Sequence, residues 1–225
     1  MPPDTLIREE DRDLLGHSEA VYSADLAHRY LLIRRWHPGG PTAVFIMLNP
    51  STATAFADDP TIRRCIGFAR RERCHALTLV NLFSARATAP LELLAHPAPN
   101  GDRNDEFIEQ HCQPGWLIIA AWGAHGVIDG RARTVTTQLA GRGIALSCLG
   151  RTATGQPRHP LYVRATAPLI PFEARTATFG PTRATMPALA RLSRSSRSAS
   201  DEAQTPNFAS HYDNVRQFVG NGVLP

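Results

Sequence analysis

The sequence predicts an α/β protein, a three-layer α/β/α sandwich around a four-stranded parallel sheet with an N-terminal β-hairpin. Three observations predict this class. Continuous apolar runs recur along the chain, as expected of strands that are buried on both faces. Amphipathic segments of helical period lie between these runs. Alternating strands and helices imply parallel pairing through right-handed crossovers, with helices on both faces of the sheet.

The strands follow from the position of the apolar runs. The hairpin is expected where two short stretches flank a polar turn, at residues 19–23 and 29–36. The parallel strands are expected at residues 43–48, 76–80, 116–121 and 144–149.

The helices are expected at residues 60–73, 90–95, 104–112 and 130–140. The first has the clearest signals, since Asp59 followed by Pro60 makes a good N-cap and first helical residue. We therefore interpret Asp58 and Asp59 as helix capping rather than as a metal-binding pair. The sequence predicts no metal site and no cofactor.

The α/β pattern ends near residue 172, so we expect one domain over residues 1–173. Residues 174–225 shift to arginine, serine, threonine, alanine and proline. Such a segment buries too little apolar surface to fold, which predicts a largely disordered tail. No apolar run approaches the ~20 residues of a membrane span, and the N-terminus is polar and acidic. A cytoplasmic protein without membrane contact is therefore expected.

The composition excludes some chemistries. All 24 basic residues are arginine, so the chain has no lysine for a Schiff base or a phosphate-binding loop. The net charge of +4 is compatible with an acidic partner such as nucleic acid. The four cysteines, none of them in a C-x-x-C pair, are expected to be reduced and mostly buried: Cys65, Cys74, Cys112 and Cys148.

Polar or glycine-rich sequence follows each of the four parallel strands. In open α/β sheets, ligands bind beyond the carboxyl ends of the strands, so these loops should converge on one crevice. The expected site residues, in strand order, are Asn49, Pro50 and Ser51, then Asn81 and Arg86, then Trp122, Gly123 and His125, and finally Arg158 and His159.

Structural interpretations of the same residues stay open. Asn49 and Pro50 can simply turn the chain, and Asn81 can cap the backbone after a strand. Trp122 can form a wall rather than a stacking platform. His125 and His159 can be histidines with satisfied hydrogen bonds and no function.

Several of these loops resemble an uncharacterised bacterial and phage family, a domain of unknown function marked by the MLNPSTA signature. The signature stands here at residues 47–53, and further matching runs are 58–65, 80–83, 121–125 and 158–162. The resemblance covers roughly residues 19–172 and implies no established activity.

The same loops, in the same order, are also similar to those of the uracil-DNA glycosylase superfamily. Asn49-Pro50 is similar to the pair that positions the attacking water. Asn81 is similar to the asparagine that reads the flipped base, and residues 121–125, AWGAH, are similar to a Trp-Gly-Ser-His segment. His159 is similar to the histidine that stabilises the uracil anion. This resemblance implies a catalytic Asn49 and His159 in a nucleobase pocket. It also implies the spatial order 2-1-3-4 for the four parallel strands.

The sequence departs from the glycosylase pattern in three places. Asn49 stands where the classical enzymes have aspartate, as in the mismatch-directed branch, and asparagine is a poor general base. Residues 161–163, LYV, replace the stretch that wedges into DNA. The cysteine spacing excludes the iron–sulfur branch.

Three functions therefore remain open. The first is an N-glycosylase-type hydrolase, or a relic of one, acting on DNA or on a nucleotide. The second is a nucleic-acid or nucleotide binding module without turnover. The third is a small-molecule hydrolase or transferase of unrelated chemistry, since a fold does not fix a function. A screen that reads both binding and base release would discriminate among them.

Overall fold

The structure, a computed structural model, describes residues 5–13, 16–87 and 90–173. All of them belong to one unit of the chain, Met1–Thr178. Residues 174–225, which the sequence predicts to be a tail, lie outside the described residues.

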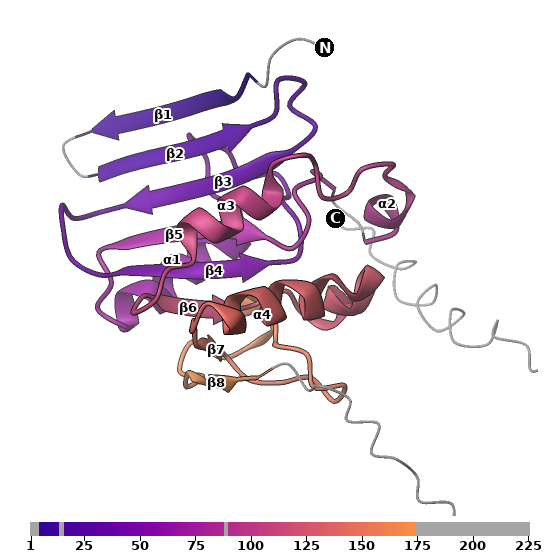
Figure 1. Cartoon of the computed structure of the whole chain (residues 1–225). Coiled ribbons are helices and arrows are strands. Elements are labelled where there is room, and N and C mark those ends of the chain that lie inside the picture. The colour runs from indigo at the N-terminus through magenta and orange to yellow at the C-terminus, as the bar shows by residue number, and fades with distance from the viewer. Residues whose placement is uncertain (1–4, 14–15, 88–89, 174–225) are drawn as a thin grey trace, which may run out of the picture. The chain divides into compact units, whose positions relative to one another are not determined.

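One mixed sheet of eight strands organises the described residues (Figure 1). Its spatial order is β1-β2-β3-β5-β4-β6-β7-β8. The strands are β1 Ile7–Asp13, β2 Gly16–Tyr22, β3 Arg29–Arg35, β4 Thr42–Met47, β5 Ala76–Asn81, β6 Leu117–Ala120, β7 Leu146–Cys148 and β8 Ile170–Phe172.

The prediction of a four-stranded parallel sheet is wrong in extent. The four strands do pair in parallel in the order β5-β4-β6-β7, which is the expected order 2-1-3-4. They are only the centre of the sheet, however, because β8 adds to β7 antiparallel. On the other side, the predicted hairpin of β2 and β3 exists and pairs antiparallel with β5, with Leu32 opposite Leu79.

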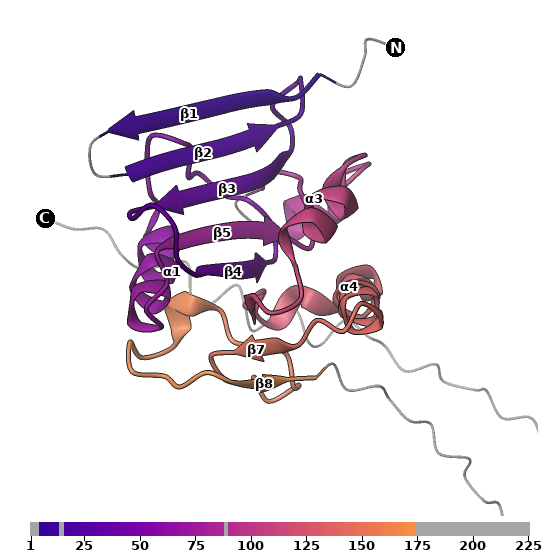
Figure 2. The same cartoon turned by 60° about the vertical axis from the view of Figure 1, so that its left-hand side comes forward.

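Helices cover both faces of the sheet, so the three layers are confirmed. The α-helices are α1 Pro60–Arg71, α2 Pro90–Ala95, α3 Asn104–His111 and α4 Arg131–Gly141, and the 3-10 helices are η1 Ala124–Gly130 and η2 Pro160–Tyr162. Figure 2 shows α1 on one side of the sheet and α3 and α4 on the other. No helix in the described ranges is both long and apolar enough to cross a membrane.

Strand β4 shows why the central strands are continuously apolar. Ala43, Phe45 and Met47 belong to the core that α1 covers, whereas Val44 and Ile46 belong to the core under α3 and α4. Both faces are buried, so every position needs an apolar side chain. The cysteines are all free and buried, as predicted.

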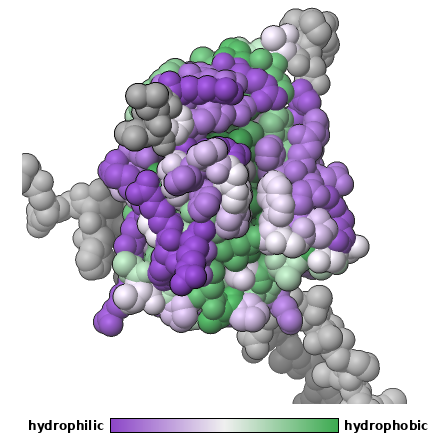
Figure 3. All heavy atoms as spheres, turned by 90° about the vertical axis from the view of Figure 1, so that its left-hand side faces the viewer, coloured by the Kyte–Doolittle hydropathy of each residue, from purple (hydrophilic) through white to green (hydrophobic). Residues whose placement is uncertain are grey.

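The start of α1 follows the predicted capping. The Asp59 carboxylate accepts a hydrogen bond from the Ile62 backbone N–H at 2.9 Å, and Pro60 occupies the first turn. The parallel strands run from left to right in Figure 1, so their carboxyl ends meet at the right-hand edge. The left-hand end of the sheet, where these strands begin, carries hydrophilic residues over much of its surface (Figure 3).

Candidate functional site

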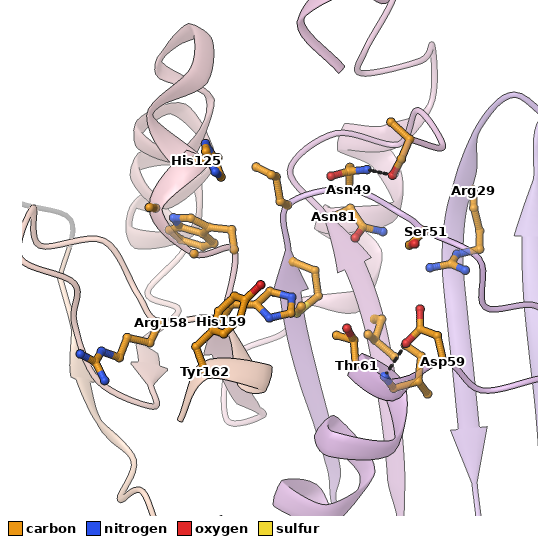
Figure 4. A pocket seen from close by; sticks show the side chains of 18 of the residues that line it. Arg29, Asn49, Ser51, Asp59, Thr61, Asn81, His125, Arg158, His159 and Tyr162 are labelled. Atoms are coloured by element: carbon orange, nitrogen blue, oxygen red, sulfur yellow. Dashed lines mark hydrogen bonds between the residues drawn. The ribbon is translucent and has the colours of Figure 1, made fainter. Parts of the chain in front are cut away.

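A cavity of about 650 Å³ opens at the carboxyl ends of the parallel strands. This volume lies within the ~300–1,000 Å³ that small-molecule sites occupy. Eight of the ten predicted site residues line it, namely Asn49, Ser51, Asn81, Trp122, Gly123, His125, Arg158 and His159 (Figure 4). Pro50 and Arg86 are not among its lining residues. Arg86 instead packs over the Tyr22 ring and donates to the Leu26 carbonyl.

Asn49 follows β4, and two hydrogen bonds fix its side chain. Its Nδ2 donates to the Pro50 carbonyl at 3.0 Å and to the Ala87 carbonyl at 2.7 Å. The amide thus ties two loops together, which agrees with the turn interpretation. Only Oδ1 is left for a ligand, and an amide oxygen accepts hydrogen bonds but takes up no proton at neutral pH. Asn49 can therefore orient a water molecule without activating it as a base.

Asn81 is the last residue of β5 and is 3% exposed. Its backbone carbonyl accepts a hydrogen bond from Asn104 Nδ2 at 2.9 Å. Its side-chain amide has no hydrogen-bond partner among the residues that the structure describes, and this amide borders the cavity (Figure 4). Buried polar groups normally find a partner. An amide that faces a cavity without one is suited to contact a ligand, as donor and as acceptor.

His159 precedes η2, and one of its two ring nitrogens forms a hydrogen bond within the protein. Its Nδ1 accepts a hydrogen bond from the Leu161 backbone N–H at 3.3 Å, so the neutral ring carries its proton on Nε2. Burial lowers the pKa of His159, and the Asp59 carboxylate opposes this effect. A neutral ring with a free Nε2–H can donate to a developing anion. Helix α1 holds this loop, because Arg64 donates to the carbonyls of Pro160 and Val163.

Trp122 forms a wall of the cavity. It is 2% exposed, its Nε1 donates to Gln156 Oε1 at 2.9 Å, and its ring meets Phe172 edge-on at 5.4 Å. Gly126 lets the chain pass close to this ring, since a Cβ there would lie 2.1 Å from Trp122 Cδ1. The indole is therefore fixed on several sides, in agreement with the wall interpretation.

The remaining predicted residues lie around this wall. Gly123 has a φ of 76°, a conformation that favours glycine. His125 is exposed at the start of η1, and Arg158 is exposed with its guanidinium pointing away from the centre of the cavity (Figure 4). The roles of the ten predicted residues in catalysis or ligand binding stay predictions.

Arg29 also lines the cavity, and the sequence interpretation missed it. It begins β3, is 3% exposed and donates from Nη1 to the Ala53 carbonyl. Because β3 runs antiparallel to β5, its first residue lies at the edge where the parallel strands end. An arginine at the start of a hairpin strand carries no sequence signal of burial. Asp59, identified only as a helix cap, lines the cavity as well.

One group among the described residues has a spacing compatible with a metal ion. Glu10, His17 and Glu19, on β1 and β2, bring their ligand atoms within 4.8 Å of one another. Both carboxylates already pair with arginines, Glu19 with Arg8 and Glu10 with Arg12. None of the three residues lines the cavity.

Fold and cavity together define an α/β protein with a pocket at the carboxyl edge of its sheet, lined by apolar and polar side chains. A family model described as "Protein of unknown function (DUF1643)" matches residues 29–161. The match covers more than half of the chain, which therefore belongs to this family. The expectation of a family of unknown function is confirmed. No curated protein matches the chain, and no solved structure matches it, including any uracil-DNA glycosylase.

Proposed function

We propose that the protein recognises a nucleobase in this cavity, as part of a nucleotide or of a nucleic acid. The observation that carries the proposal is the buried, unpartnered side-chain amide of Asn81. An amide presents a donor beside an acceptor, which matches the hydrogen-bonding edge of a base. The similarity of the loops to those of uracil-DNA glycosylases supports the same interpretation.

The walls of the cavity suit a flat aromatic ring. Met47, Ile62 and Leu79 are each 5% exposed or less and line it together with Trp122. A nucleobase has two apolar faces and a polar edge, so apolar walls beside one amide complement its shape and its polarity. Ligand sites commonly combine apolar walls with a few convergent polar groups.

The same geometry supports hydrolysis of an N-glycosidic bond as the reaction. In this mechanism Asn49 Oδ1 accepts a hydrogen bond from a water whose oxygen bonds to the anomeric carbon of the sugar. The carbon–nitrogen bond breaks, and its electron pair leaves with the base. His159 Nε2–H donates to the resulting anion. The water proton passes to solvent, since Asn49 takes up none.

A binding module without turnover is the second candidate, and the fixed amide of Asn49 favours it. With Nδ2 bound to two carbonyls, this side chain supplies neither a base nor a nucleophile. Such a site would bind a base and release it unchanged.

The experiment is a screen of purified protein against nucleosides, nucleotides and oligonucleotides with modified or mismatched bases. Binding is read by calorimetry and base release by chromatography. If the protein is a hydrolase, His159→Ala should lower the rate of base release by ~10²–10³-fold. Arg133→Ala, on the exposed face of α4, is the control and should leave the rate unchanged. The absence of binding to every base in the screen would refute the proposal.

A further inference from the structure

Three arginines are buried among the described residues, and they differ in their partners. Arg34 is 7% exposed and its Nε binds Asp58 Oδ1 at 2.8 Å. Arg131 is 6% exposed and pairs with the Asp105 carboxylate. Arg29 is the most buried of the three, at 3%, and forms no ion pair with any described carboxylate. Buried charges are normally paired, so Arg29 is the exception to be explained.

The hydrogen bond that Arg29 forms within the protein uses only part of its guanidinium group. Nη1 donates to the Ala53 carbonyl, which holds the loop between β4 and α1. Arg34 holds the same loop through the Thr54 carbonyl. The difference lies in the other nitrogens: Arg29 Nε is buried with no partner in the described part of the chain. Holding the loop therefore does not account for the whole charged group.

The local electrostatics favour an anion beside Arg29. Burial lowers the pKa of Arg29 to about 10, so the guanidinium stays protonated at neutral pH. Two acidic groups act on it, the Tyr22 hydroxyl and the Asp59 carboxylate. The Tyr22 hydroxyl donates to Glu9, and the Asp59 carboxylate is engaged as the cap of α1. Arg34 and Arg86 add positive charge nearby. A ligand anion would supply the missing counter-charge.

Arg29 and the proposed base contacts belong to one cavity. Figure 4 shows the Arg29 guanidinium on the opposite side of the cavity from His159, with Asn81 and Ser51 between them. A cavity of about 650 Å³ has room for more than a free base. Guanidinium groups bind phosphate through charge-assisted, often bidentate hydrogen bonds.

We propose that Arg29 forms an anion subsite that binds a phosphate of the ligand, so that the cavity takes a phosphorylated nucleotide unit rather than a base or nucleoside. The identity of the base partner rests on the proposed function, whereas the anion subsite rests on Arg29 itself. The phosphate belongs either to a free nucleotide or to a nucleic-acid backbone, and both present the same group to the guanidinium.

The test compares the affinities of matched ligands for the full-length protein. Calorimetry measures the dissociation constants of nucleosides, of their 5′- and 3′-monophosphates, of inorganic phosphate and of a short single-stranded oligonucleotide. Hydrogen bonds to a charged group predict that monophosphates bind about 10- to 100-fold more tightly than the nucleosides. Inorganic phosphate should compete with the monophosphates, while the same ionic strength of chloride should compete far less.

Two variants of Arg29 and one control variant assign the effect to Arg29. Arg29→Met should abolish the preference for monophosphates, and Arg29→Lys, which keeps a positive charge, should retain part of it. Arg34 lies on the same strand as Arg29 but does not line the cavity. The control Arg34→Met should therefore keep the preference for monophosphates. Should a methionine variant fail to fold, Arg29→Lys and phosphate competition on the unmodified protein decide the question.

The outcomes separate the two proposals. Equal affinity for nucleosides and monophosphates, without competition by phosphate, overturns the anion subsite and leaves base recognition standing. Arg29-dependent binding of inorganic phosphate, with no further gain from any base, supports the subsite and overturns base recognition. If the oligonucleotide binds more tightly than the monophosphates, the phosphate belongs to a nucleic acid. If the monophosphates bind more tightly than the oligonucleotide, the ligand is a free nucleotide.

Discussion

Replacing Asn81 with leucine should separate ligand binding from stability. The Asn81 side chain has no hydrogen bond to another described residue, so the substitution breaks none within that part of the chain. Leucine has a similar volume and suits the end of a buried strand. Replacing a buried polar group that lacks a partner is nearly neutral or stabilising, so we expect the free energy of unfolding to stay the same or rise by up to about 1 kcal/mol. Ligand affinity should be lost.

Asn104→Leu is the matched control, since Asn104 is also a buried asparagine, but it does not line the cavity and its side-chain nitrogen is hydrogen-bonded. Its Oδ1 is buried without a partner among the described residues. Its Nδ2 donates to the Asn81 carbonyl at 2.9 Å and to the Leu82 carbonyl at 3.0 Å. The loss of two bonds at about 0.5–1.5 kcal/mol each predicts a destabilisation of about 1–3 kcal/mol. For a domain of this size that corresponds to a Tm lower by about 2–12 °C.

Urea unfolding followed by tryptophan fluorescence measures the stabilities, and calorimetry with the best ligand of the screen measures binding. The reasoning is refuted if Asn81→Leu destabilises the protein as much as Asn104→Leu does. It is refuted equally if Asn81→Leu binds the ligand as tightly as the unmodified protein.

Three further outcomes are expected. Burial lowers the pKa values of His28, His111 and His159, so their neutral forms favour the folded state. Tm should therefore fall as pH drops below their ordinary pKa of 6.5, while above this value the three histidines add no pH dependence. A thiol reagent should modify the four buried cysteines only after denaturation, as stoichiometric absorbance would show. Gly126→Ala should displace the Trp122 ring, destabilise the protein by about 1–3 kcal/mol in urea unfolding and weaken ligand binding.

The centre of the sheet was predictable because burial dictates its sequence. Strands β4 and β5 are buried along almost their whole length, so an unbroken apolar run marks each of them. The outer strands lack this signal. Six of the seven residues of β1 are charged, and β8 has only three residues, one of them Pro171. Strand β1 is held by pairing with β2, which the sequence of β1 alone does not reveal.

The cavity was predictable to the extent that it follows from parallel strands. Asn49, Trp122 and His159 come after such a strand, Asn81 ends one, and the topology brings all four to one edge. Arg29 could not be found in this way, because it begins a strand instead of following one. Its place depends on β3 pairing with β5, a long-range choice that the local pattern of a hairpin does not encode.

The pairing of β3 with β5 also bears on how the chain matures on the ribosome. Strand β3 leaves the ribosome before β4, yet its partner β5 is made only after β4 and α1. The N-terminal hairpin therefore cannot pair with the rest of the sheet until β5 has been synthesised. His159 arrives later still, after β7. Within the described part of the chain, the cavity is thus completed by one of the last segments to be synthesised, so a nascent chain cannot form the whole cavity before β7 and the loop after it have been made.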